Sequence, residues 1–492
     1  MRRRCPSPLD EGSGTDGRLE RKGVLYARFR YVQELVNAPL ESRSSNTSPI
    51  IIPRPEHNIS RVNISPNAIK VLYRLREAGY RACMVGGGVR DLLLGREPKD
   101  FDIATDAHPE QVYKLFRNCR LIGRRFRLAH IQFGQEIIEV ATFRAYSGAG
   151  GEACEGSESH SVKRANDGRI LSDNVYGNIE EDAWRRDFTI NALYYDITDF
   201  TVLDYVGGIA DLKARLIRLI GDPAQHYHED PVRLLRAVRF AAKLGFRLDP
   251  ETEAPLHWLG YLLDKIPPAR LFDEILKLFL GGSALQTFWL LRHYRLFGRL
   301  FPDTERCLGH QQQHYPKTLL IRALSSTDAR LAKGQPINPA FLFAALLWEP
   351  LQERMRQLRT TDDLGEQELL QMAAETVIQT QVRHAALPRR YSLPMREIWA
   401  LQQRLTITAG KHPLRLLTHP RFRAGYDFLL LRADTDEQAA ELADWWTRFL
   451  ALDDSDRIQA TQPEVKAKKS KSRHRKPRSR KSEQTVSPSP KP

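Results

Sequence analysis

The sequence is poor in cysteine and has no long apolar run. Only five cysteines occur among 492 residues, and none of them forms a C-x-x-C pair. Their odd number and scattered positions argue against a disulfide framework or a zinc cluster, so we expect a reducing, cytoplasmic setting. Apolar stretches such as Ala340–Trp348 are far shorter than the roughly 20 residues of a membrane-spanning helix. No apolar region follows the basic N-terminus, so we expect no secretory signal.

The sequence has fewer acidic than basic residues, and most of the difference lies in the C-terminal tail. Lys and Arg total 75 against 60 Asp and Glu, which gives a formal net charge of +15. In 465–492, eleven basic residues stand against one acid, Glu483, so this tail carries +10 of the +15. With few apolar residues it is expected to be disordered. Such a density of cations attracts polyanions, with nucleic acid favoured over an anionic membrane surface.

The length and the local patterns predict several domains. Short strands are expected at Ala82–Val85, Lys99–Ala104 and Ile137–Phe143, and 145–173 is expected to be a mobile insertion because it is rich in Gly, Ser and charge. Beyond about residue 216 the patterns are helical. We therefore predict an extension over 1–52, an α+β head over 53–215, a helical neck over 216–280, a helical body and tail over 281–455, and a disordered basic tail over 456–492.

The most informative stretch is VGGGVRDLLLGREPKDFDIATD. Residues two apart in a strand lie on one face, so Asp100 and Asp102 are expected to project together. Adjacent carboxylates repel each other and favour a bound cation, and Mg²⁺ prefers such oxygen ligands. In the strand GQEIIEVATF, Glu139 faces away from the apolar side and toward the same open side as the pair. Three carboxylates can hold two metal ions for nucleotidyl transfer.

A glycine turn lies directly upstream of these aspartates. A strand runs into Gly86 and Gly87 and then into a helix, and glycines let backbone N–H groups approach phosphates at a helix N-terminus. Arg90 lies in the first turn of that helix and can neutralise a triphosphate. The turn matches neither G-x-x-x-x-G-K-[ST] nor G-x-G-x-x-G, which argues against a P-loop ATPase or a Rossmann dehydrogenase. A phosphate cradle beside a carboxylate pair predicts nucleotidyl transfer.

Two later segments are rich in charge. In IEEDAWRRDFTINALYYD, Asp182 can pair with Arg185 or Arg186, since they are three and four positions apart on a helix. In HEDPVRLLRAVRFAAKLGF, Asp230 is expected to be an N-cap before Pro231. The helix that follows has a cationic face that is either solvated or able to hold a base edge or phosphates. This face consists of Arg233, Arg236, Arg239 and Lys243.

A further segment, PRFRAGYDFLLLRA, interleaves arginines with aromatic residues. Arg421 and Arg423 alternate with Phe422, Tyr426 and Phe428. Such a pattern can stack and steer single-stranded RNA, although a core helix with surface arginines explains it equally well.

These motifs resemble those of the class II nucleotidyltransferase superfamily, which contains bacterial poly(A) polymerases and CCA-adding enzymes. The stretch from Met84 to Phe116 is similar to the superfamily's head, and EEDAWRRDFTINALYYD and HEDPVRLLRAVRFAAKLG are similar to its later motifs, in the same order. LIGRRFRLAHIQFGQEIIEVATFR, INPAFLFAALLWEP and the basic tail are similar to the bacterial poly(A) polymerase I family, from about residue 50 to 450.

The resemblance implies a fold and a set of site residues. The fold is an α+β head, a nucleotidyltransferase palm with a small mixed sheet, followed by all-helical neck, body and tail domains with disordered termini. Asp100 and Asp102 are implied as Mg²⁺ ligands, with the third carboxylate from Glu139 or Asp182. ATP binding is implied for Gly86, Gly87, Arg90, Arg185, Arg186, Asp187, Asn191, Asp230, Arg233 and Arg236. We assign RNA binding to Arg124, Arg125, Arg239, Lys243, Arg421 and Arg423.

The predicted function is template-independent transfer of AMP from ATP to RNA 3′ ends, in mRNA processing and decay. The alternatives are a CCA-adding tRNA nucleotidyltransferase and an RNA-binding protein with an inactive palm. We expect a monomer whose partners are RNA 3′ ends and ATP, with RNA-decay or RNA-chaperone proteins as candidate protein partners.

Overall fold

The computed structural model describes residues 49–123, 127–145, 163–164, 170–172, 175–309, 319–361, 364–434 and 436–461. Several predictions lie outside these ranges. They are the extension up to residue 48, most of the insertion at 145–173, Arg124 and Arg125, and the basic tail from 462 onward.

The head is built on a mixed sheet, as predicted. Its order is β1-β10-β9-β2-β3-β6-β5-β4, and β3 and β6 form a parallel pair while the other neighbours are antiparallel. The strands are β1 (Ile50–Ile52), β2 (Ala82–Val85), β3 (Asp102–Thr105), β4 (Cys119–Ile122), β5 (Leu128–Phe133), β6 (Glu136–Thr142), β9 (Leu193–Asp196) and β10 (Thr201–Asp204). A separate pair joins β7 (Lys163–Arg164) to β8 (Ile170–Ser172).

Two boundaries in the head differ from the prediction. Ile50–Ile52 pairs with β10, so the sheet begins inside the predicted extension 1–52. The strand predicted from Lys99 begins only at Asp102, which leaves Asp100 in the loop before it. By contrast, Ser65 followed by Pro66 is a sequence pattern that predicts the start of a helix, and the structure confirms it: α2 begins at Pro66, and the Ser65 side chain accepts a hydrogen bond from the Asn67 N–H.

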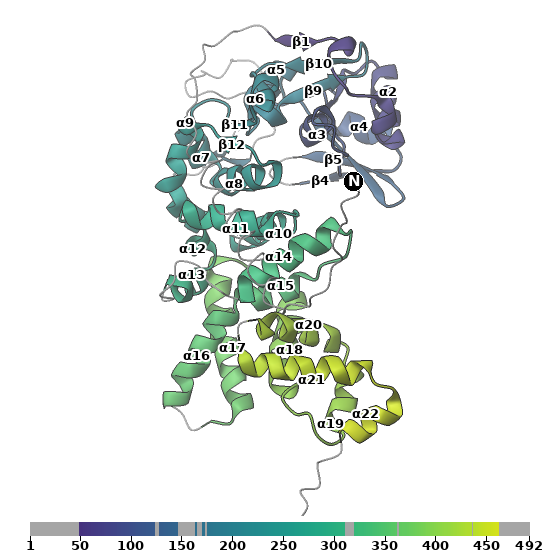
Figure 1. The fold of residues 1–492 in the computed structure, drawn as a ribbon. Helices are drawn as coiled ribbons and strands as arrows, with labels where there is room; N and C mark the ends of the chain where they lie inside the picture. The colour runs from purple at the N-terminus through teal and green to yellow at the C-terminus, as the bar shows by residue number, and fades with distance from the viewer. Residues whose placement is uncertain are drawn as a thin grey trace, which may run out of the picture.

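Helices cover both faces of the sheet (Figure 1). On one face, α2 (Pro66–Glu77) and α4 (Pro109–Leu115) pack over the apolar residues Met84, Ile103 and Val140. On the other face, α5 (Ile179–Trp184) packs in a smaller cluster with Val85, Ala104 and Tyr194. The helices α3 (Gly87–Leu93) and α6 (Gly208–Ala214) and the 3-10 turns η1 (Arg54–Glu56), η2 (Arg61–Asn63) and η3 (Thr189–Asn191) complete the head.

Downstream of the head the chain is helical apart from a two-stranded sheet of β11 (Leu216–Ile217) and β12 (Arg247–Leu248) (Figure 1). The segment predicted as the neck contains α7 (Pro223–Glu229), α8 (Val232–Leu244), α9 (Pro250–Glu253), η4 (Ala254–His257), η5 (Leu259–Lys265) and α10 (Pro268–Phe279). The segment predicted as the body and tail contains α11 (Ala284–His293), α12 (Phe297–Leu300), α13 (Pro302–Gly309), α14 (Leu319–Ala332), α15 (Pro339–Leu346), α16 (Trp348–Thr361), α17 (Glu366–His384), α18 (Arg389–Arg404), α19 (His412–Leu417), α20 (Phe422–Ala433), α21 (Glu437–Ala451) and α22 (Asp454–Ala460).

The helical region has two departures from the predicted pattern. The apolar pattern of 284–300 predicts a single helix, but the structure splits it, because Arg295 adopts a left-handed φ of 56° between α11 and α12. The basic tail predicted from 456 begins later, since α22 continues to Ala460. Among the described helices, none combines the length and the hydropathy that crossing a bilayer requires.

Candidate active site

Two strands bring the predicted carboxylates together. In the parallel pair β3–β6, Asp102 is the register partner of Glu139, and the next pair is Ile103 with Val140. Ile103 and Val140 are buried in the main core, so Asp102 and Glu139 project from the opposite face. Asp100 lies exposed two residues before Asp102. The alternation in the sequence therefore predicted the correct face for Glu139.

The Asp102 carboxylate has a raised pKa, so its ionised form is not fully stabilised by the surrounding protein. Burial, with the nearby charge of Glu139 and a smaller effect of Asp100, raises the pKa of Asp102 to about 6 although Arg186 opposes the shift. A carboxylate that ionises this reluctantly beside two others is stabilised by a cation. The oxygen donors of Asp100, Asp102 and Glu139 fit a hard divalent metal ion.

Asp102→Asn is expected to stabilise the metal-free protein at pH values well above 6. The folded-state pKa of Asp102 lies above its ordinary value of 3.8, so the folded protein binds the proton more tightly than the unfolded chain. Ionisation of Asp102 therefore lowers stability as the pH rises through about 6, and the advantage of the variant should vanish below about pH 4. Melting temperatures measured across this range in EDTA test the sign. An added divalent cation should raise the melting temperature of the unmodified protein more than that of the variant.

The glycine turn lies directly beside these carboxylates. Gly86 has a φ of 77° and caps α3, a conformation that disfavours any side chain. A Cβ on Gly86 would stand 4.0 Å from Asp102 Oδ2 and 3.8 Å from Arg186 Nη1, and a Cβ on Gly88 would stand 3.3 Å from the Asp100 carbonyl oxygen. Backbone, carboxylate and guanidinium thus converge at the start of α3.

Arg90 lies beneath the glycine turn. It is 3% exposed, and its guanidinium donates to Asp91 Oδ1 at 2.7 and 2.9 Å and to Asn191 Oδ1 at 2.5 Å. It also stands over the Phe240 ring of α8, 5.3 Å from the ring centroid. Arg90, which is predicted to bind the triphosphate, therefore links the glycine turn to α8. Its guanidinium group lies next to Gly87.

Asp182 has partners within the protein for both of its carboxylate oxygens. Oδ2 accepts from Arg186 at 2.8 Å and from the Tyr194 hydroxyl at 2.7 Å, and Oδ1 accepts from the Arg144 backbone N–H at 3.2 Å. Burial alone would raise the pKa of Asp182, but Arg186 and Tyr194 together lower it. Asp182 therefore forms the ion pair that its spacing from Arg186 allowed, whereas Glu139 is the register partner of Asp102.

The residues implied in nucleotide selection form a second polar layer between head and neck. Asp187 accepts from Arg236 Nε at 2.6 Å and from the Asn191 side chain at 3.2 Å. Arg233 donates to His226 Nδ1 at 2.7 Å and to the Arg185 carbonyl oxygen at 3.5 Å. These contacts bring Arg185 and Asp187 of the sequence RRDFT next to Arg233 and Arg236 of α8.

Asp230 is placed differently from the prediction. The helix α8 begins at Val232 with Pro231 as its N-cap, so Asp230 precedes the cap rather than forming it. Its Oδ2 accepts from Arg270 Nη2 of α10 at 2.7 Å. A partner forty residues downstream could not be read from the local spacing.

The two groups of predicted RNA-binding residues that the structure describes differ in their surroundings. On α8, Lys243 is exposed and Arg239 is partly buried over Phe240, and burial together with the neighbouring Arg236 lowers the pKa of Arg239. Arg90 and Arg236 stand over the same Phe240 ring. Three guanidinium groups around one ring concentrate positive charge between α3 and α8.

The stacking interpretation of the segment at 420–433 is wrong for its aromatic rings. Phe422, Tyr426 and Phe428 are 8%, 5% and 0% exposed, because α20 packs against both α18 and α21. Arg421 pairs with Glu397 at 3.2 Å and Arg423 pairs with Asp427 at 2.9 Å. The segment is thus a core helix with surface arginines, the other interpretation that its sequence allowed.

Two polar residues of the site escaped the sequence analysis. His130 on β5 contacts Glu139 Oε2 at 3.1 Å, and Tyr194 on β9 orients Asp182. The alternation in LAHIQF marks His130 as facing away from the core, but only the β5–β6 register shows that it meets Glu139.

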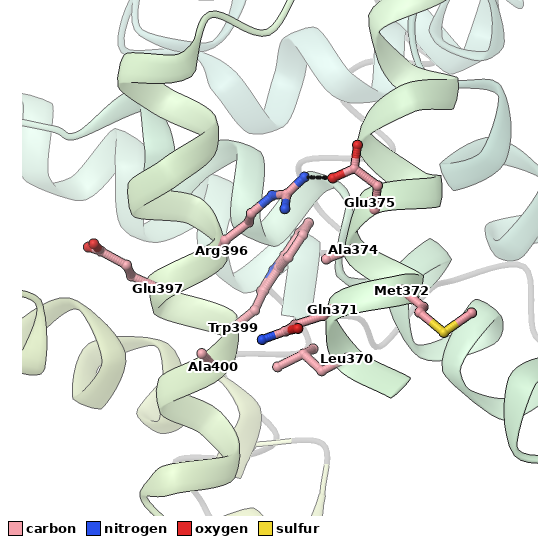
Figure 2. A pocket seen from close by; sticks show the side chains of 9 residues that line it. All are labelled: Leu370, Gln371, Met372, Ala374, Glu375, Arg396, Glu397, Trp399 and Ala400. Atoms are coloured by element: carbon pink, nitrogen blue, oxygen red, sulfur yellow. Dashed lines mark hydrogen bonds and ion pairs between the residues drawn. The ribbon is translucent and has the colours of Figure 1, made fainter. Parts of the chain in front are cut away.

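A hollow of about 550 Å³ lies in the body between α17 and α18 (Figure 2). Its walls include Leu370, Met372 and Trp399, and an ion pair between Arg396 and Glu375 crosses its edge. It contains none of the predicted site residues.

The fold and this site define a nucleotidyltransferase. Residues 82–218 match the family described as "Poly A polymerase head domain". Residues 245–308 match "Probable RNA and SrmB- binding site of polymerase A", and 362–481 match "Polymerase A arginine-rich C-terminus". A protein of Salmonella typhi, "Poly(A) polymerase I", is 51% identical over 405 residues, which is 82% of this chain and 86% of that protein. The chain belongs to the bacterial poly(A) polymerase I family.

CCA-adding enzymes are more distant relatives. The CCA-adding enzyme of Lactobacillus helveticus is 38% identical over 221 residues, which is 45% of this chain and 51% of that protein. The crystal structure of the Bacillus stearothermophilus CCA-adding enzyme in complex with CTP superposes with a TM-score of 0.50 at 24% identity, over 80% of this chain and 88% of that one. This likeness shows a shared fold.

Proposed function

We propose that the protein is a template-independent polynucleotide adenylyltransferase that adds AMP from ATP to RNA 3′ ends. The structural observation that supports this proposal is the alignment of Asp102 with Glu139 beside the Gly86 turn. The identity to poly(A) polymerase I over more than four-fifths of the chain supports ATP and RNA as substrates. In the reaction, the RNA 3′-hydroxyl oxygen forms a bond to the α-phosphorus of ATP, and the bond to pyrophosphate breaks.

Asp100, Asp102 and Glu139 would hold Mg²⁺ in this proposal. When bound, the metal supplies charge stabilisation at the attacking and leaving oxygens. Within the protein, burial and the nearby charge of Glu139 raise the pKa of Asp102, and Arg186 only partly offsets them. His130 restrains Glu139 by a contact at Oε2, which leaves Oε1 for a metal ion in this proposal.

The glycine turn and the arginines position the triphosphate. Gly87 has no side chain to block the approach of a phosphate to its backbone N–H, whereas the Gly86 N–H already donates to the Leu193 carbonyl oxygen at 3.3 Å. Arg186 is held by Asp182 and Tyr194, with its Nη1 directed toward Gly86. Because Arg186 is fixed before the substrate arrives, it loses little side-chain entropy on binding a phosphate.

The layer around Asp187 would position the adenine ring. Burial would raise the pKa of Asp187, but Arg236 lowers it, so the carboxylate remains charged and paired. Burial and Arg233 lower the pKa of His226 to about 4, so the imidazole is neutral and its Nδ1 accepts from Arg233. Arginine with an in-plane acceptor can distinguish base edges, and a rigid layer of this kind favours a single base.

The proposal is tested by supplying different substrates to the purified protein. An unstructured RNA with ATP alone should yield long A tails, and CTP alone should yield little addition. A tRNA that lacks its terminal CCA, given CTP and ATP, serves as the comparison. Addition that stops after C-C-A on the tRNA would identify the CCA-adding alternative, and RNA binding with no addition would identify an inactive palm.

A further inference from the structure

Three metal-ligating side chains meet at the junction of neck and body, outside the candidate active site. Glu253 ends α9, His257 ends η4, and His293 is the last residue of α11. One ligand atom from each lies within 4.8 Å of the others. Both histidines are exposed and Glu253 is half-buried, so an ion has open access from solvent.

We propose that Glu253, His257 and His293 bind a divalent transition-metal ion, with Zn²⁺ as the preferred ion. Two imidazoles and one carboxylate are a known zinc donor set, with water completing a tetrahedral site. Imidazole donors favour zinc and its neighbours, whereas Mg²⁺ prefers oxygen donors alone. The donor set thus differs in kind from the three carboxylates of the head.

Tyr294 supports the cluster through a hydrogen bond to one of its members. The Tyr294 hydroxyl donates to Glu253 Oε1 at 2.7 Å and leaves Oε2 for an ion. Tyr294 is 1% exposed, so this hydrogen bond is held rigidly by the core. A hydrogen bond to a metal-ligating carboxylate orients it and typically changes metal affinity by about 10- to 100-fold.

The arrangement of the two histidine rings is also compatible with a metal ion that bridges the two segments. The His257 and His293 ring centroids are 5.7 Å apart, and both rings pack edge-on against Tyr294. Glu253 and His257 are four residues apart, so they project from one side of a helical segment. An ion held there would join the α9–η4 segment to the end of α11, directly before the left-handed turn at Arg295. It should therefore stabilise this junction.

The test is metal binding by the full-length protein. After treatment with a chelator, Zn²⁺ is titrated by calorimetry in excess Mg²⁺, which occupies the carboxylates of the head. We expect one high-affinity Zn²⁺ per chain, a rise in melting temperature, and the visible absorption of tetrahedral Co²⁺ when cobalt replaces zinc. His257→Ala and Glu253→Gln should lose all three signals, and Tyr294→Phe should weaken Zn²⁺ affinity about 10- to 100-fold.

His384→Ala, which removes a histidine at the end of α17, is the matched control and should bind Zn²⁺ unchanged. If the unmodified protein binds no Zn²⁺ in excess Mg²⁺, the cluster is an aromatic packing contact only and the proposal is wrong. Unchanged stoichiometry in His257→Ala would also overturn it. Neither outcome depends on nucleotide addition.

Discussion

Replacing Asp100 and Asp102 together with alanine is expected to abolish nucleotide addition while RNA binding persists. The Asp102 carboxylate lies beside Gly86 on the open side of the sheet, and the charge of Asp100 is near enough to raise the pKa of Asp102. Under the proposed function, the loss of both carboxylates removes donors for the divalent metal. Metal-ion stabilisation of transition-state charge contributes several kcal/mol, and each 1.36 kcal/mol corresponds to a factor of ten in rate. A loss of about a thousandfold or more is therefore expected in the rate of AMP incorporation with saturating RNA and ATP.

The fold should tolerate this change. Asp100 is exposed, and the raised pKa of Asp102 shows that its charge is destabilising in the metal-free protein. Glu97→Ala, an exposed carboxylate in the same loop, is the matched control and should keep full activity. RNA affinity measured by fluorescence anisotropy should be similar in all three proteins. A double variant that still polymerised would show that the carboxylate assignment is wrong.

Asp182→Ala is expected to destabilise the protein by about 3–5 kcal/mol, whereas Glu139→Gln should leave stability nearly unchanged and reduce activity. Removing Asp182 leaves the Arg186 guanidinium without its carboxylate partner, and the side chains are only 8% and 22% exposed. The Tyr194 hydroxyl loses its acceptor as well. Glu139 is 41% exposed at its side chain and pairs with His130 in solvent, where such pairs contribute little.

Denaturation in urea together with AMP incorporation separates the two carboxylates. Asp182→Leu combined with Arg186→Met is the informative control for stability, because replacing both partners with apolar groups should recover much of the loss. If instead Asp182→Asn were stable and inactive while Glu139→Gln remained active, the third catalytic carboxylate would be Asp182. The structure predicts the opposite result, since the two Asp182 oxygens have partners within the protein.

Local sequence patterns were sufficient where the physical cause is local. The alternation in GQEIIEVATF predicted the face of Glu139, because successive side chains of a strand point to opposite sides. Ser65 followed by Pro66 predicted the start of α2, because an N-cap residue bonds to backbone groups only two or three positions further along the chain. The glycine turn is another such case: at Gly86 the backbone conformation favours glycine.

Where a sequence pattern had two physical explanations, only the tertiary packing could distinguish them. Arginines and aromatics at 420–433 fit both a stacking surface and a core helix, and the choice depends on α18 and α21, which bury the rings. The cationic face of α8 was likewise ambiguous until Arg236 was seen to pair with Asp187 and Arg239 to lie over Phe240.

The motifs in the chain were enough to indicate a nucleotidyltransferase, because the glycine turn and the carboxylate pair, which this chemistry needs close in space, are also close in this sequence. Only the tertiary structure distinguishes Glu139 from Asp182 as candidates for the third carboxylate. Each carboxylate has the right chemistry, but one is the register partner of Asp102 and the other is occupied by Arg186 and Tyr194. Strand register and long-range ion pairs join residues far apart in the chain, so no local spacing encodes them.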